Sequence, residues 1–89
     1  MSNFPLLELF YFDSCPFCIR VLKVIDKLKI KVELKNIDTD ESSLERLNKD
    51  TGKKTVPCLY IDNKPMFESL DIIEYLEANQ NHLVKRDSK

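Results

Sequence analysis

Residues 10–28 read FYFDSCPFCIRVLKVIDKL, and this stretch places Cys15 and Cys18 three positions apart around a proline. The residues before the pair, 6–12, are apolar and rich in aromatic side chains, which is typical of a buried strand. From position 16 to 28, apolar residues recur every third or fourth position with charged residues between them, which predicts an amphipathic helix. The cysteine pair therefore lies where a strand leads into a helix.

The middle of the chain predicts a second strand and a second helix. Residues 31–37 (KVELKNI) alternate between apolar and polar, as a strand with one half-exposed face does. Ser42 and Glu45 have the spacing of a capping box, so a short helix is expected to begin there. Gly52 is the only glycine in the chain, and it is expected to end that helix.

The last third predicts a hairpin followed by a helix. Residues 56–61 (VPCLYI) and 64–68 (KPMFE) are strand candidates, and Asp62-Asn63 between them tolerates the left-handed conformation of a tight turn. Ser69 is expected to cap a final helix. The order β-α-β-α-β-β-α predicts an α/β fold with one four-stranded mixed sheet, a parallel pair at its start, and helices packed on it.

Composition limits the class of protein. A chain of 89 residues fits a single domain, 1–89. The net charge of −1 gives no reason to expect nucleic acid or an anionic membrane as partner. No apolar stretch reaches the roughly 18 residues that span a bilayer. Three cysteines, an odd number, behind a start that lacks the features of a secretory signal indicate a cytoplasmic protein without a disulfide framework.

A cysteine pair at a helix start is suited to redox chemistry. If Ser14 or Cys15 is the N-cap, Pro16 takes the first helical position, where its missing N–H costs nothing. Cys15 then faces the unpaired N–H groups and the positive end of the helix dipole, which favour the thiolate. Cys18 lies one turn further in and is the natural resolving thiol for a mixed disulfide on Cys15.

A C-x-x-C pair has two other common uses, a structural zinc site and a permanent disulfide. A structural zinc site takes four ligands, and here no second pair is present and the only histidine, His82, lies in a polar tail. A permanent disulfide is uncommon in the cytoplasm. No metal site is therefore expected, and redox chemistry is the first hypothesis.

Two motifs together resemble the glutaredoxin family, which has the thioredoxin fold. They are C-P-F-C after a first strand and T-V-P, residues 55–57, before a third strand. The resemblance covers nearly the whole chain. It implies that Cys15 is the nucleophile that attacks a glutathione mixed disulfide and that Cys18 resolves it.

The resemblance also implies a glutathione site. Pro57 matches the cis-proline beside the active disulfide, and the backbone of Val56 matches the position that hydrogen-bonds the cysteinyl part of glutathione. In the stretch TGKKTVP, Lys54 or its neighbour Lys53 is the candidate for binding the glycyl carboxylate. An ordinary strand-edge proline and a solvated loop lysine are the alternative interpretations.

The sequence departs from the usual glutaredoxin pattern at two places. Phe12 stands where many members have a lysine, and Asp13 adds a negative charge near Cys15 that would oppose thiolate formation. The stretch MFESLDIIEYL, residues 66–76, is similar to the N-terminal domain of glutathione transferases instead. There a Glu-Ser pair binds the γ-glutamyl end of glutathione, which implies that role for Glu68 and Ser69, and points to the transferase-like subgroup of glutaredoxins.

The expected function is a glutathione-dependent thiol-disulfide oxidoreductase that acts as a monomer on glutathionylated or disulfide-bonded proteins. Glutathione is its co-substrate, and no tightly bound cofactor is required. Cys58 follows Pro57 in a strand and is expected to be a buried, inert thiol. Two alternatives stay open: a glutaredoxin that binds or transfers an iron–sulfur cluster, and a non-catalytic binding module derived from a transferase.

Overall fold

The computed structural model describes residues 4–85 and contains four strands, three α-helices and one short 3₁₀ helix among them. No helix in this range has the length and apolar character needed to cross a membrane. In chain order the elements are β1 (Leu7–Tyr11), α1 (Pro16–Leu28), β2 (Glu33–Asn36), α2 (Glu41–Thr51), β3 (Cys58–Ile61), β4 (Lys64–Met66), α3 (Ser69–Ala78) and η1 (Gln80–His82).

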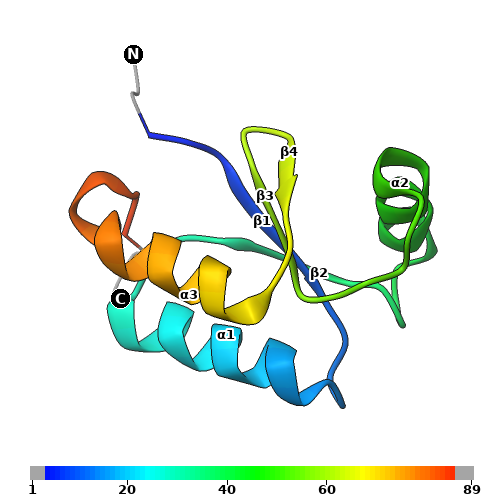
Figure 1. The fold of residues 1–89 in the computed structure, drawn as a ribbon, viewed down its shortest axis with the longest axis horizontal. Helices are drawn as coiled ribbons and strands as arrows, with labels where there is room; N and C mark the ends of the chain where they lie inside the picture. The colour runs from blue at the N-terminus through cyan, green and yellow to red at the C-terminus, as the bar shows by residue number, and fades with distance from the viewer. Residues whose placement is uncertain (1–3, 86–89) are drawn as a thin grey trace.

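The strands form one mixed sheet in the order β2-β1-β3-β4. β1 and β2 are parallel, whereas β3 is antiparallel to both β1 and β4. α1 and α3 lie side by side on one face of this sheet, and α2 lies apart from them on the opposite side (Figure 1). The predicted fold class, including the parallel first pair and the antiparallel hairpin, is confirmed.

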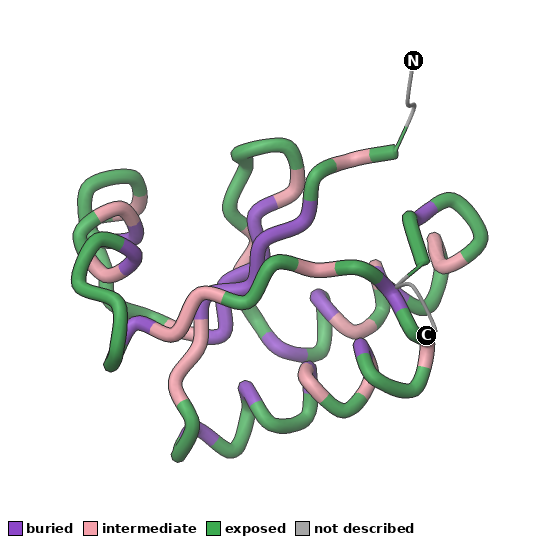
Figure 2. The backbone as a smooth tube through the Cα atoms, turned by 180° about the vertical axis from the view of Figure 1, so that it is seen from behind, coloured by how far each residue is buried: buried purple, intermediate pink, exposed green. Residues whose placement is uncertain are grey.

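Strand β1 divides the interior into two clusters because successive side chains point to opposite faces. Leu7 and Leu9 belong to the cluster beneath α1 and α3. Phe10 belongs to the cluster on the α2 side, which also contains Cys58 and Tyr60 from β3. Figure 2 shows that the buried residues concentrate in the central strands and on the sheet-facing sides of the helices.

Helix α1 begins as the sequence predicts. Cys15 is its N-cap, with extended backbone angles, and Pro16 occupies the first turn. At the other end Lys29 adopts a left-handed conformation (φ 56°), and its N–H bonds to carbonyls of the last turn. Cys18, Val21 and Ile25 form the buried stripe of the helix.

The predicted capping box of α2 is wrong. The helix begins at Glu41, and its N-cap is Asp40. The Asp40 carboxylate accepts hydrogen bonds from the hydroxyls of Ser43 (2.6 Å) and Ser42 (2.8 Å). The Ser43 bond, followed by the Ser42 bond, holds the pKa of Asp40 below its usual value. Ser42 therefore lies within the first turn of the helix, and its hydroxyl donates a hydrogen bond to the N-cap residue Asp40.

The hairpin turn is as predicted, and the start of α3 is not. Asp62 and Asn63 both have positive φ, 49° and 70°, as a two-residue hairpin turn requires. Ser69 is the first residue of α3 and not its N-cap, which is Glu68. Glu68 has a φ of 72°, a conformation that turns the chain sharply from β4 into the helix.

Gly52 ends α2, and replacing it tests how much its conformation contributes to stability. Its φ is 71°, its N–H bonds to the Asn48 carbonyl, and an added Cβ would meet no atom within 4 Å. We expect Gly52→Ala to lower the free energy of unfolding by about 1 kcal/mol, through backbone strain alone. Urea unfolding measures this, with Gly52→Asn as the control that tolerates the same conformation. An increase in stability for Gly52→Ala would contradict the assignment.

Candidate active site

The first two cysteines meet at the start of α1. The Cys15 sulfur accepts the backbone N–H of Cys18 at 3.3 Å, so it serves as the side-chain cap of the helix. Cys15 is 6% exposed, whereas Cys18 is fully buried. Both are free thiols. Cys15 is therefore the less buried thiol of the pair, and its sulfur lies at the N-terminal end of α1.

The protein keeps Cys18 protonated. Burial, assisted by a hydrogen bond to the Cys15 side chain, raises the pKa of Cys18 from 9.0 to about 12. A thiol with this pKa is not a nucleophile at neutral pH. Cys18 is therefore a poor nucleophile toward a molecule that approaches from solution.

Cys58 is a third buried thiol and belongs to β3, whereas the cysteine pair lies at the start of α1. It belongs to the cluster on the α2 side of the sheet and is fully buried. Burial raises its pKa to about 12. These properties agree with the expectation of an inert core thiol.

A cleft of about 350 Å³ lies where α1, the segment before β3, and the start of α3 come together. It borders the helix that carries the cysteine pair, although neither cysteine is among its lining residues. Its lining comprises Phe17, Arg20, Thr55, Val56, Pro57, Glu68, Ser69 and Leu70. Figure 1 shows why these segments meet, because α1 and α3 both begin at the same end of the sheet.

Four of the five glutathione contacts that the resemblance implied lie in this cleft, namely Val56, Pro57, Glu68 and Ser69. The Val56–Pro57 peptide bond is cis, as the resemblance implied. Ser69 is nearly buried, with 9% of its surface exposed. Lys54, the fifth, is exposed in the preceding loop and does not line the cleft.

The loop before the cleft is held by local contacts. The Thr51 hydroxyl accepts the N–H of Lys53 at 3.2 Å and donates to the Leu47 carbonyl at 2.7 Å. The ammonium of Lys53 lies 4.9 Å from the centre of the Phe67 ring, a cation–π distance. Lys53 is thereby directed toward the chain that leads into Glu68.

Sequence reasoning missed Phe17, Arg20, Thr55 and Leu70 as lining residues. Phe17 lies inside the quoted C-P-F-C motif, is 54% exposed, and has Arg20 three residues later on the same helical side. An exposed apolar residue beside a candidate nucleophile indicates that the residue could line a binding site. The sequence does not show which other helix lies opposite Phe17.

The two residues that depart from the glutaredoxin pattern have separate environments. Phe12 is half-buried and packs against the cluster on the α2 side of the sheet. Asp13 is exposed, and its carboxylate accepts a hydrogen bond from the Asn36 side chain at 3.3 Å. Asp13 is thus tied to the end of β2. Within residues 4–85, no group of three or more His, Cys, Asp or Glu side chains is arranged to hold a metal ion.

The sequence matches a known protein family and several known proteins. Residues 9–83 match the family "Glutathione S-transferase, N-terminal domain". Glutaredoxin 2 of Escherichia coli strain K12 is 32% identical over 72 residues, covering 80% of this chain and 33% of that protein. Glutaredoxin 1 of Rickettsia prowazekii is 38% identical over 53 residues, covering 56% of this chain and 55% of that protein.

The solved structures agree. Wheat glutaredoxin superimposes with a TM-score of 0.62 at 27% identity, over 81% of this chain and 70% of that one. The chain spans about a third of the length of the E. coli relative and just over half of the Rickettsia relative. The chain belongs to the family of glutathione S-transferase N-terminal domains and is a glutaredoxin-like protein of the thioredoxin fold.

Proposed function

We propose that the protein is a glutathione-dependent thiol-disulfide oxidoreductase that reduces glutathione mixed disulfides through Cys15. The proposal depends above all on the contrast between the two thiols at the start of α1. Cys15 is 6% exposed and accepts a hydrogen bond on its sulfur, whereas Cys18 is fully buried with a pKa raised to about 12. The adjoining cleft, with polar groups from three segments, supplies a place for a small peptide thiol.

The proposed reaction begins with attack of the Cys15 thiolate on the glutathione sulfur of a mixed disulfide. A Cys15–glutathione disulfide forms, and the substrate leaves as a thiolate that takes a proton from water. A second glutathione thiolate then attacks the bound glutathione sulfur. This step yields glutathione disulfide and restores the Cys15 thiolate.

A protein disulfide follows a second route. Cys15 first forms a mixed disulfide with the protein substrate. Cys18 then attacks the Cys15 sulfur while its proton passes to the departing substrate sulfur, which forms the Cys15–Cys18 disulfide and releases the substrate thiol. Two glutathione molecules subsequently reduce that disulfide. Positions three apart at a helix start permit this bond.

The test is reduction of a glutathionylated peptide, coupled to glutathione reductase. We expect Cys15→Ser to lower the rate by more than about 1000-fold, because the nucleophile is removed. Cys18→Ser should retain activity on this substrate and lose the reduction of protein disulfides. Glu68→Ala should raise KM for the glutathionylated peptide.

Cys58→Ala is the matched control, since it removes a thiol that lies outside the site, and it should react as the wild type does. Activity of Cys15→Ser within tenfold of the wild type would refute the proposal. So would a wild-type protein that does not reduce the glutathionylated peptide at all.

A further inference from the structure

Two large apolar side chains are exposed at the rim of the cleft. Phe17 of α1 is 54% exposed, and Leu70 of α3 is 69% exposed. We call these two side chains the apolar rim. Exposed apolar side chains of this size lose their contact with water when another protein surface covers them, which favours that contact. The apolar rim is therefore suited to contact with a protein as well as with a small molecule.

The position of Cys15 decides which proteins reach this rim. Its sulfur lies at the start of α1, and the residue is only 6% exposed, so a disulfide that reacts with it must come into contact with the surface there. Helix α3 begins at the same end of the sheet and lies beside α1 (Figure 1). A protein segment that is bonded to Cys15 is therefore held beside the first turns of these two helices.

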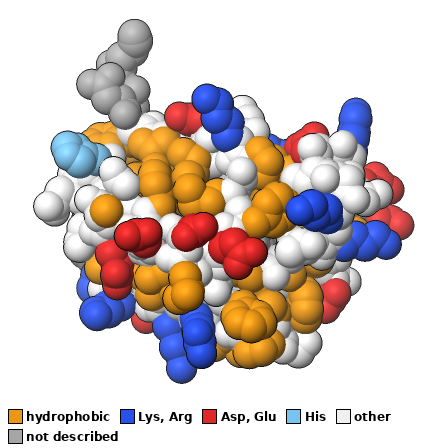
Figure 3. Space-filling view, in the orientation of Figure 1, with side chains coloured by type: hydrophobic (Ala, Val, Ile, Leu, Met, Phe, Trp, Pro, Cys, Tyr) orange, Lys and Arg blue, Asp and Glu red, His pale blue; other side chains and the backbone are white. Residues whose placement is uncertain are grey.

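Helix α3 is acidic along its exposed side. Asp71, Glu74 and Glu77, which we call the acidic row, are exposed and spaced three residues apart, and Glu68 precedes them. Residues 65–84 contain no lysine or arginine. Within residues 4–85, no ion pair involves any of these carboxylates. Figure 3 shows acidic side chains in a row across this face of the molecule.

Helix α1 has the opposite sign. Its basic residues Arg20, Lys23 and Lys27 are exposed, and Asp26 is its only acidic residue. In the part of the chain that the structure describes, no ion pair links these cations to the acidic row. The negative field along α3 is therefore not neutralised by its neighbour. A protein segment on the α3 side of the cleft meets carboxylates, so positive charge on that segment is favoured.

We propose that the acidic row selects protein disulfides whose neighbouring residues are lysine or arginine. This inference rests on the proposed function, because it concerns the route in which Cys15 forms a mixed disulfide with a protein. An apolar residue beside the reacting cysteine covers the apolar rim, and basic residues beyond it lie near the carboxylates of α3. In the complete reaction the Cys15 and Cys18 thiols are oxidised to a disulfide, and the substrate disulfide is reduced to two thiols.

The experiment measures how fast three peptide disulfides oxidise the reduced chain in the absence of glutathione. All three have a leucine beside one cysteine, and two flanking positions are both lysine, both glutamine or both glutamate. Alkylation and mass spectrometry follow formation of the Cys15–Cys18 disulfide. At about 20 mM ionic strength we expect the lysine peptide to react about tenfold faster than the glutamine peptide, and the glutamate peptide to be the slowest. At about 0.5 M salt the differences should fall below about twofold.

The variant Asp71→Asn/Glu74→Gln should lower the ratio of the lysine and glutamine rates to about two or less. Its matched control is Glu41→Gln/Glu45→Gln, which changes the net charge equally at exposed positions of α2, on the opposite side of the sheet, and should keep the tenfold ratio. Because both rates are measured on the same protein, their ratio cancels any change in the reactivity of Cys15. Both variants should reduce the mixed disulfide of glutathione and 2-mercaptoethanol as the wild type does.

The outcomes separate the two proposals. The inference is refuted, and the proposed function stands, if the wild type reduces the small mixed disulfide but shows no preference for the lysine peptide. The same holds if the preference survives in the α3 variant, or if the α2 control loses it equally. If the wild type does not reduce the small mixed disulfide, both proposals are refuted. A preference that only the α3 variant loses supports the inference.

Discussion

Replacing Cys15 by serine is expected to slow the reaction of the folded protein with iodoacetamide at pH 8 by about three orders of magnitude. The two remaining thiols, Cys18 and Cys58, are fully buried, and burial raises the pKa of each to about 12. At pH 8 such a thiol is ionised in about one molecule in ten thousand, about a thousandth of the fraction for an ordinary cysteine thiol with a pKa of 9.0. Because only the thiolate reacts, a variant that retains only these two thiols should react about a thousandth as fast as an ordinary cysteine.

The pH dependence gives a second measurement on the same samples. Since the folded protein holds both thiols in the protonated form, the alkylation rate of Cys15→Ser should rise about tenfold per pH unit from pH 8 to 10. Mass spectrometry identifies the modified residue. In 6 M guanidinium chloride both thiols should react at the ordinary rate, which controls for oxidation. A folded Cys15→Ser protein that reacts within tenfold of the wild type would contradict the assignment of the reactive thiol.

The elements that the sequence predicted correctly are those whose signal is local. The change from an apolar run to a helical period around Cys15, with Pro16 at the first helical position, located β1 and α1. Asp62 and Asn63 located the hairpin because their side chains tolerate positive φ. Each of these features depends on neighbours in the chain, so it can be predicted without knowledge of the tertiary contacts.

The two errors at helix starts arose from competition between adjacent cap residues. Ser42 and Glu45 have the spacing of a capping box, but Asp40 lies two residues earlier and takes both serine hydroxyls. At α3 the chain turns at Glu68 with φ 72°, which moves Ser69 into the first helical position. Spacing alone does not rank one candidate cap above another.

The missing parts of the site are those that depend on which elements face each other. Val56, Pro57, Glu68 and Ser69, which line the cleft, were predicted as site residues because motifs include them. Arg20 was not found, because its side chain becomes part of the cleft only when α1 packs beside α3. The contact between Glu8 and Arg46 was not predicted for the same reason, because these residues are 38 positions apart and meet only in the folded protein.

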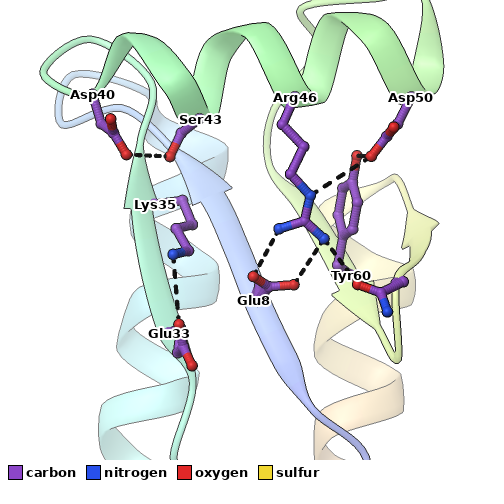
Figure 4. Close-up of polar contacts among 9 residues, drawn as sticks. Glu8, Glu33, Lys35, Asp40, Ser43, Arg46, Asp50 and Tyr60 are labelled. Atoms are coloured by element: carbon purple, nitrogen blue, oxygen red, sulfur yellow. Dashed lines mark hydrogen bonds and ion pairs between the residues drawn. The ribbon is translucent and has the colours of Figure 1, made fainter.

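Removing the Arg46 side chain is expected to lower the free energy of unfolding by about 3 kcal/mol. Glu8 lies in the central strand β1 and is 6% exposed, and its carboxylate binds Arg46 of α2 through two hydrogen bonds, 2.8 and 3.0 Å (Figure 4). Arg46 also donates to the Asn63 side chain at 3.0 Å. Its guanidinium carbon lies 4.6 Å from the centre of the Tyr60 ring.

Arg46 therefore connects α2 to β1, to β3 and to the turn between β3 and β4. Tyr60 donates a hydrogen bond to Asp50 of α2 at 2.9 Å, and burial together with this bond raises the pKa of the phenol. Arg46→Ala would leave the Glu8 carboxylate buried without its partner. Loss of one member of a buried ion pair costs about 3–5 kcal/mol. Since the Arg46 side chain is one-third exposed, we expect the lower end, about 3 kcal/mol.

Urea unfolding followed by circular dichroism measures this loss. Lys49→Ala is the matched control, because Lys49 is an exposed cation of the same helix that takes no part in these contacts, and it should change stability by less than about 0.5 kcal/mol. The double variant Glu8→Leu/Arg46→Met removes both charges together and should recover most of the stability that Arg46→Ala loses. If Arg46→Ala unfolds at the same urea concentration as Lys49→Ala, the ion pair does not hold α2 to the sheet.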